Sequence, residues 1–95
     1  MPNSYTLNQN YPNPFNSETE IVFSISKLKN IKIEIWSLDG RLIKTLLDSR
    51  LMPGQYGIKW FGKNNSGKIQ STGIYFSTLS VDQKIIKTRK LIYVK

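Results

Sequence analysis

Residues 30–36, NIKIEIW, are the stretch that decides the fold, because apolar side chains recur there at every second position. In an extended chain the three isoleucines share one face, and the lysine and glutamate between them share the other. Such alternation predicts a half-buried β-strand. Asp39-Gly40 follows shortly after and is typical of a two-residue type I′ turn, which needs positive φ angles.

This turn predicts a hairpin with the arms Ile31–Leu38 and Arg41–Leu47. The second arm could also be read as a short helix, but a hairpin turn just before it favours a strand. Outside the hairpin, the same reading predicts the strands Glu20–Ser26, Gln55–Phe61, Ile74–Val81 and Ile85–Val94. Turn signals separate these strands at Leu51–Gly54, in the polar loop Gly62–Lys68 and near Asp82-Gln83.

The chain begins with a strip, residues 5–16, in which two prolines favour extended conformations and turns. We call it the N-terminal strip and expect it to wrap the body, anchored by Leu7, Tyr11 and Phe15. With it, about seven short strands recur at spacings of roughly 8–14 residues, which predicts an all-β antiparallel sandwich or barrel. All 95 residues fit one domain, 1–95, in which residues 1–4 are a flexible or cloning-derived start.

Composition argues against catalysis. The chain has no cysteine and no histidine, so we expect no Cys/His metal site, no cofactor and no histidine general base. Glu18 and Glu20 share a strand face, but glycosidase chemistry needs carboxylates facing each other across a cleft. The loop Lys63–Lys68 holds asparagines and no acid, so a hydrogen-bonded turn is favoured there over calcium.

Two aromatic features could serve recognition. Tyr56 and Trp60 fall on the face of Ile58 and are predicted core residues, whereas Trp36 lies opposite the isoleucine face. Trp36 is therefore the best candidate for an exposed aromatic platform, but an inter-strand contact or cover over a sheet edge is favoured. Tyr75, just after Gly73, is placed to return its hydroxyl to a backbone group at a sandwich corner.

The net charge is +8, and beyond Asp82 the chain has five basic residues and no acid. A basic surface favours anionic partners, although lysines also protect edge strands and keep proteins soluble. No aromatic-basic motif accompanies the charge, so we expect no nucleic-acid partner. No apolar run approaches the roughly 20 residues of a membrane span, and the polar start has no signal-peptide core. We expect either a cytoplasmic chain or a piece of a longer exported precursor.

Six stretches together resemble one family, in the order that the family has them. They are LNQNYPNPFN (7–16), TEIVFSI (19–25), IWSLDGRLI (35–43), PGQYGIKW (53–60), NSGK (65–68) and KTRKLIYVK (87–95). They resemble the type A C-terminal sorting domains of the type IX (Por) secretion system, which end cargo proteins in Bacteroidetes and related phyla. The departures from the family pattern are mild. Phe61 stands where the pattern usually has Asp, Trp36 replaces a common Tyr, and Ser71-Thr72 precedes Gly73 where Ser or Ala is usual.

The resemblance implies an Ig-like sandwich of seven strands and a non-catalytic secretion signal at the end of a larger precursor. It implies passage through the periplasm, recognition by translocon components, and a final place at the cell surface or outside the cell. Such domains are often cleaved by a cell-surface sortase, which attaches the cargo to anionic lipopolysaccharide. The last two strands carry much of the signal in this family, and by position this maps onto Gly73, Tyr75, Lys90 and Lys95.

Three other functions remain open at this point. The first is a carbohydrate-binding or fibronectin-like accessory module of an extracellular enzyme, which would use Trp36. The second is an Ig-like domain similar to those of flagellar hook-capping proteins. The third is a binder of acidic polymers, whose affinity would fall steeply with salt. In each case exposed edge strands could support a weak dimer through sheet extension.

Overall fold

The computed structural model describes residues 4–95, so the expectation of a flexible or cloning-derived start falls largely on residues outside the described part. Seven strands make up the described chain: β1 (Thr6–Leu7), β2 (Thr19–Ile25), β3 (Lys29–Ser37), β4 (Leu42–Leu51), β5 (Gly54–Trp60), β6 (Gly73–Val81) and β7 (Lys84–Tyr93). The predicted all-β class and strand number are confirmed. No helix in residues 4–95 has the length and apolar character needed to cross a membrane.

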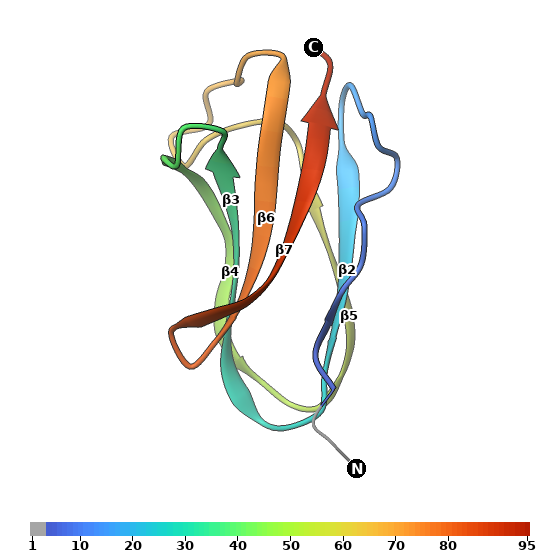
Figure 1. The fold of residues 1–95 in the computed structure, drawn as a ribbon, viewed down its shortest axis with the longest axis vertical. Coiled ribbons are helices and arrows are strands. Elements are labelled where there is room, and N and C mark those ends of the chain that lie inside the picture. The colour runs from blue at the N-terminus through green and yellow to red at the C-terminus, as the bar shows by residue number, and fades with distance from the viewer. Residues whose placement is uncertain (1–3) are drawn as a thin grey trace.

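The strands form two antiparallel sheets packed face to face (Figure 1). One sheet has the order β1-β2-β5 and the other the order β4-β3-β6-β7. The links β2–β3, β4–β5 and β5–β6 each cross from one sheet to the other. The result is the predicted Ig-like sandwich, elongated to 41 × 22 × 20 Å.

The alternation in β3 explains why it is the centre of the larger sheet. Ile31, Ile33 and Ile35 are each 1% exposed or less and fill the space between the sheets. β3 pairs with β4 on one side and with β6 on the other, so that both of its backbone edges are hydrogen-bonded. Burying three β-branched side chains on one face stabilises the sandwich by about 1.5–3 kcal/mol for each side chain.

The β3–β4 turn differs from the prediction. Only Gly40 has a positive φ, +87°, and the amide of Gly40 donates to the carbonyl of Ser37. The loop therefore has three residues, a turn followed by a left-handed glycine, and the two-residue type I′ turn predicted at Asp39-Gly40 is wrong. β4 also continues to Leu51, beyond its predicted end at Leu47.

The positive φ pair that a type I′ turn needs lies instead in the β6–β7 hairpin. Asp82 and Gln83 have φ values of 51° and 73° between the paired ends Val81 and Lys84. Asp82 fits because its side chain accepts a hydrogen bond from the Asn30 amide and its own amide donates to the Asn30 carbonyl. The tertiary partner thus favours a conformation that neither residue prefers by itself.

A cluster of aromatic rings fills one end of the core. Trp60 is 1% exposed, and its ring centroid lies 5.5 Å from Phe15, 5.3 Å from Tyr75 and 5.9 Å from Tyr93. The indole Nε1 of Trp60 donates to the Lys63 carbonyl, so its polar atom is satisfied although the ring is buried. Residues from the start, middle and end of the chain therefore meet in one contact.

The N-terminal strip is anchored differently from the prediction in one respect. Leu7 and Phe15 are buried, as predicted, but Tyr11 is 81% exposed. Asn10, which is 3% exposed, is the anchor instead. Its side-chain Nδ2 donates to the Thr19 hydroxyl and to the Pro12 carbonyl. A polar anchor of this kind has no apolar signal in the sequence, because its value comes from partners distant along the chain.

Candidate functional site

The acidic residues are not arranged as a catalytic pair. Glu18 pairs with Lys59 at 3.1 Å on the surface, and Glu20 is exposed beside Gly57. Within residues 4–95 no three His, Cys, Asp or Glu side chains come together as a metal-binding group. In the loop after β5, Asn64 Oδ1 accepts hydrogen bonds from the Ser66 and Lys68 amides, which is the predicted hydrogen-bonded turn.

Gly73 and Tyr75, two of the residues mapped by resemblance, begin β6. The Tyr75 hydroxyl donates to the Ser71 carbonyl at 2.6 Å, which confirms the predicted tyrosine corner. Tyr75 is 5% exposed, so it meets the core rather than the solvent. Gly73 is different: it has no positive φ, and a Cβ built on it would meet nothing within 4 Å. The local structure therefore gives no reason for glycine at position 73.

Lys90 lies in β7, whose outer edge is held by the N-terminal strip. Gln9 Nε2 donates to the Lys90 carbonyl at 2.6 Å, and Asn13 Oδ1 accepts from the Ile92 amide at 2.9 Å. The Phe15 amide donates to the Ile92 carbonyl, and the Val94 amide donates to the Phe15 carbonyl. We call these contacts the clasp.

The clasp also reaches the middle of β7, because Arg89 Nε donates to the Leu7 carbonyl at 2.7 Å. On its other side the strip bonds to β2, with the Tyr11 and Glu20 backbones exchanging two hydrogen bonds. In Figure 1 the strip is the blue segment that runs alongside the light-blue β2. The clasp covers the edge of β7 from Arg89 onward, and this edge is not an open strand in the folded domain.

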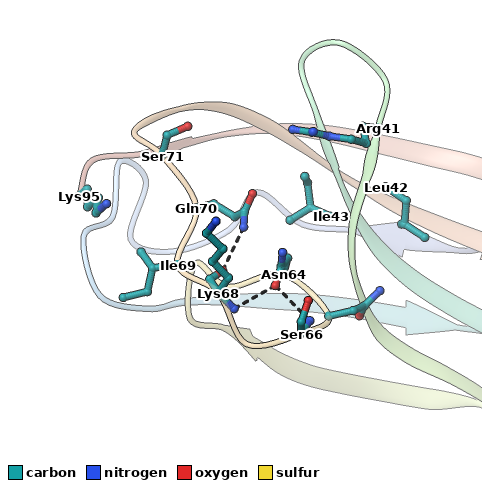
Figure 2. Close-up of a pocket in the computed structure, with 11 residues that line it drawn as sticks. Arg41, Leu42, Ile43, Asn64, Ser66, Lys68, Ile69, Gln70, Ser71 and Lys95 are labelled. Atoms are coloured by element: carbon teal, nitrogen blue, oxygen red, sulfur yellow. Dashed lines mark hydrogen bonds between the residues drawn. The ribbon is translucent and has the colours of Figure 1, made fainter.

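Lys95, the last of the mapped residues, lines a polar cavity at the same end of the sandwich as Gly73. Its amide donates to Thr72 Oγ1 at 2.9 Å, which holds the chain against the β5–β6 loop. The cavity has a volume of about 570 Å³, and Figure 2 shows Arg41, Lys68 and Lys95 around it. No aspartate or glutamate side chain lines it.

Trp36 lies on the outer face of the larger sheet, as predicted, but it is not a free platform. It is half-buried, and its indole Nε1 donates to Thr78 Oγ1 of the neighbouring strand at 3.0 Å. Phe76 and Ile85 line the same shallow depression. Trp36 thus makes the inter-strand contact that was favoured over an exposed platform.

Sequence reasoning missed the polar residues of the clasp and a second tyrosine corner. Gln9 and Asn13 are predicted only as part of an extended strip, although the pattern Tyr11-Pro12-Asn13-Pro14 marks a rigid segment able to present side chains. Tyr56 was predicted to be a core residue and is half-buried, stacked on Phe23 with centroids 5.5 Å apart. Its hydroxyl donates to the Met52 carbonyl at 2.6 Å, the same four-residue return as Tyr75 to Ser71.

Residues 9–95 match the family model described as "Secretion system C-terminal sorting domain". The chain belongs to this family. Its members are the C-terminal sorting signals of the type IX secretion system, and the match begins inside the N-terminal strip and runs through β7. The sorting domain family is non-catalytic, and its domains direct cargo to the cell surface or the extracellular space.

Three solved structures share the fold of this sorting domain. Dimeric latent PorU from Porphyromonas gingivalis matches with a TM-score of 0.79 and 20% identity, over 99% of this chain and 10% of that one. PorZ of the type-IX secretion system from the same organism matches with a TM-score of 0.58 and 17% identity, over 94% and 11%. A β-glucosidase from Listeria innocua matches with a TM-score of 0.51 and 9% identity, over 96% and 16%.

All three likenesses are below 25% identity and establish the sandwich fold alone. The sorting domain spans about a tenth of the length of PorU and PorZ. No curated protein matches the chain.

Proposed function

We propose that this domain is a secretion signal that is carried through the periplasm at the end of its cargo protein. Translocon components recognise it at the outer membrane. A cell-surface sortase then separates it from the cargo by cutting before the N-terminal strip. The clasp supports this position of the cut, because a cut inside residues 7–15 would break hydrogen bonds that hold β7. The exposed Lys90 and Lys95 and the half-buried Gly73 contact the receptor, while Tyr75 acts by holding the corner of β6.

The observation that carries the proposal is Gly73. Glycine is usually required by a positive φ or by a close approach, and Gly73 has neither. It pairs with Tyr93 at the end of the β6–β7 hairpin, beside the segment that leads to Lys95. A bare backbone at an accessible strand end suits the close approach of another protein chain.

The test is secretion of a fluorescent reporter fused to the domain in a cell that has a type IX translocon. Gly73→Ala and Lys90→Glu are expected to leave the reporter in the periplasm while the unfolding midpoint of the purified domain stays unchanged. Lys27→Glu is the matched control for Lys90→Glu, because it makes the same change of charge at an exposed lysine outside β6 and β7.

Deleting residues 90–95 should also stop secretion, with folding checked separately because half of a paired strand is lost. Normal secretion of Gly73→Ala and Lys90→Glu together would refute the proposed contact residues. Normal secretion of the 90–95 deletion would refute the proposal that the domain is the secretion signal.

A further inference from the structure

Three basic residues and no aspartate or glutamate side chain line the cavity beside Lys95. Arg41 comes from the β3–β4 loop just before β4, Lys68 from the β5–β6 loop and Lys95 from the segment after β7, so three distant parts of the chain bring cations to it. All three side chains are exposed and none forms a salt bridge among residues 4–95, although Arg41 is close enough to Asp39 to help lower the pKa of that carboxyl. Clustering like charges costs folding free energy unless an anion neutralises them.

The amide side chains around the cavity have fixed orientations. Asn64 Oδ1 is used by two backbone amides, so Asn64 Nδ2 points away from them toward the cavity, as Figure 2 shows. Gln70 has the opposite orientation: its Nε2 donates to the Lys68 carbonyl, which leaves Oε1 free to accept. The cavity therefore offers cations and an N–H donor for carboxylates together with one acceptor for a peptide N–H.

The walls of the cavity are held in place before any ligand arrives. The Asn65 amide donates to the Ile43 carbonyl at 3.0 Å, and the Thr45 amide donates to Asn65 Oδ1 at 3.1 Å. The Gln70 amide donates to the Gly62 carbonyl at 2.8 Å. The first two bonds fix the β5–β6 loop to β4 and the third closes the loop on itself, so the cavity walls lose little conformational entropy when a ligand binds.

The positive charge continues past the cavity. Asn64 also lines a neighbouring hollow of about 280 Å³ with Lys44, Lys59 and Lys63, again without a carboxylate in the lining. Lys59 is already paired with Glu18, which leaves Lys44 and Lys63 to extend the path. Two adjoining hollows lined by several cations suit a segment with several negative charges better than a single ion. No aromatic ring lines the larger cavity, so it has no stacking surface for a sugar.

We propose that this cavity binds an acidic peptide segment of a partner protein, whose carboxylates pair with Arg41, Lys68 and Lys95. Asn64 Nδ2 donates to a carboxylate or carbonyl of the segment, and Gln70 Oε1 accepts one of its backbone N–H groups. The inference deepens the proposed sorting function and rests on it for its biological role, because Lys95 belongs to both.

The direct test uses the purified domain and a fluorescein-labelled hexaglutamate peptide, with binding measured by fluorescence anisotropy. The pocket variant Arg41→Gln/Lys68→Gln/Lys95→Gln removes three exposed cations that line the cavity. The control variant Lys27→Gln/Lys84→Gln/Lys87→Gln removes three exposed cations that do not, so the two have the same net charge. We expect the pocket variant to bind at least about tenfold more weakly than the wild type, and the control variant to lose less than about threefold.

Two results would overturn the assignment. Equally weakened binding of hexaglutamate by both variants would show that its affinity depends only on the overall charge of +8. Displacement of hexaglutamate by sulfate, at an ionic strength where chloride leaves it bound, would show a simple anion site with no preference for a peptide. A Gln70→Glu variant adds a second check, since a carboxylate at the free acceptor position should repel the probe by a further severalfold.

Secretion of the reporter fused to the pocket variant separates this inference from the sorting proposal. Lost binding with normal secretion would keep the acidic-peptide site and refute its use in sorting. Retained binding with failed secretion would keep Lys95 as a sorting residue and refute the acidic-peptide site. Loss of both, with the control variant normal in both assays, is the expected outcome.

Discussion

At the scale of single residues, the two tyrosine corners show how one hydroxyl can fix a strand start. Tyr75 and Tyr56 both return a hydrogen bond to the carbonyl four residues earlier, but Tyr75 is buried among aromatic rings and Tyr56 is half-buried. Water can replace the lost partner of the exposed Met52 carbonyl more readily than that of the Ser71 carbonyl. The same substitution should therefore cost different amounts at the two corners.

We expect Tyr75→Phe to lower the free energy of unfolding by about 1–1.5 kcal/mol and Tyr56→Phe by about 0.5 kcal/mol. Urea denaturation of the two variants and the wild type measures this, with the slope of the transition as a check that the unfolded state is unchanged. Equal costs would mean that burial does not decide the value of these bonds.

Gly62 occupies a position where a side chain would be strained and would clash with the core. Its φ is +73°, and a Cβ there would lie 2.6 Å from Tyr93 Cζ, inside the aromatic cluster. Gly67 has φ +84°, and a Cβ built on it would meet nothing within 4 Å. A side chain at position 67 would therefore be strained by the backbone conformation but would not clash.

We expect Gly67→Ala to destabilise the domain by about 1–2 kcal/mol, the cost of a left-handed alanine. Gly62→Ala should cost at least about 2 kcal/mol more, because the ring of Tyr93 has to move within a packed core. Thermal unfolding of both variants measures the difference. A difference near zero would show that the aromatic cluster can adjust.

At the scale of elements, the clasp decides which strand edges stay open. β7 is the last strand of its sheet, and an unpaired edge invites pairing with another chain. The N-terminal strip satisfies the part of that edge beyond Arg89 with side-chain and backbone bonds. An edge-to-edge dimer of the kind that edge strands allow would therefore have to use the first half of β7 or another edge strand.

Replacing Asn13 by Ala should open this part of the edge without touching the core, because Asn13 Oδ1 accepts from the Ile92 amide. We expect hydrogen exchange at the Ile92 amide to speed up by at least about tenfold, since a local opening replaces a protected state. Amide exchange followed by NMR measures it. Asn16→Ala, a change of an exposed residue in the same strip, is the control and should leave the Ile92 amide protected.

At the scale of the whole molecule, charge links stability to pH. The hydrogen bond that Asp82 accepts from the Asn30 amide lowers the pKa of the Asp82 carboxyl, and Lys29 at 3.3 Å adds to this. The Ser37 hydroxyl likewise lowers the pKa of Asp39. A carboxyl with a lowered pKa stabilises the folded state above the unfolded value, near 4, and loses this contribution as pH falls through the folded pKa. Protonation of all six acids also leaves the 14 basic residues unopposed.

We expect the unfolding midpoint to be flat near neutral pH and to fall below about pH 4. Asp82→Asn keeps the side-chain oxygen that accepts from the Asn30 amide but removes the charge. The difference in midpoint between wild type and Asp82→Asn should therefore be largest near neutral pH and shrink as the pH falls below about 4. A difference that is constant with pH would mean that the charge of Asp82 does not contribute.

The sequence by itself determined the elements of this protein and its family. Period-two patterns such as that of residues 30–36 encode strands locally, because the side chains of an extended chain alternate between faces whatever surrounds them. The ordered motifs from residue 7 to residue 95 indicated a sorting domain, and the absence of histidine and cysteine argued against catalysis for chemical reasons that need no coordinates.

Only the tertiary structure decided how those elements contact and hydrogen-bond to one another. The type of the β3–β4 turn, the positive φ values of Asp82 and Gln83, and the buried Asn10 all depend on partners far away in the chain. The same holds for the clasp and for the cavity shared by Arg41, Lys68 and Lys95. Hydrogen bonds and charge clusters of this kind join residues up to 82 positions apart, and local sequence patterns carry no information about such pairings.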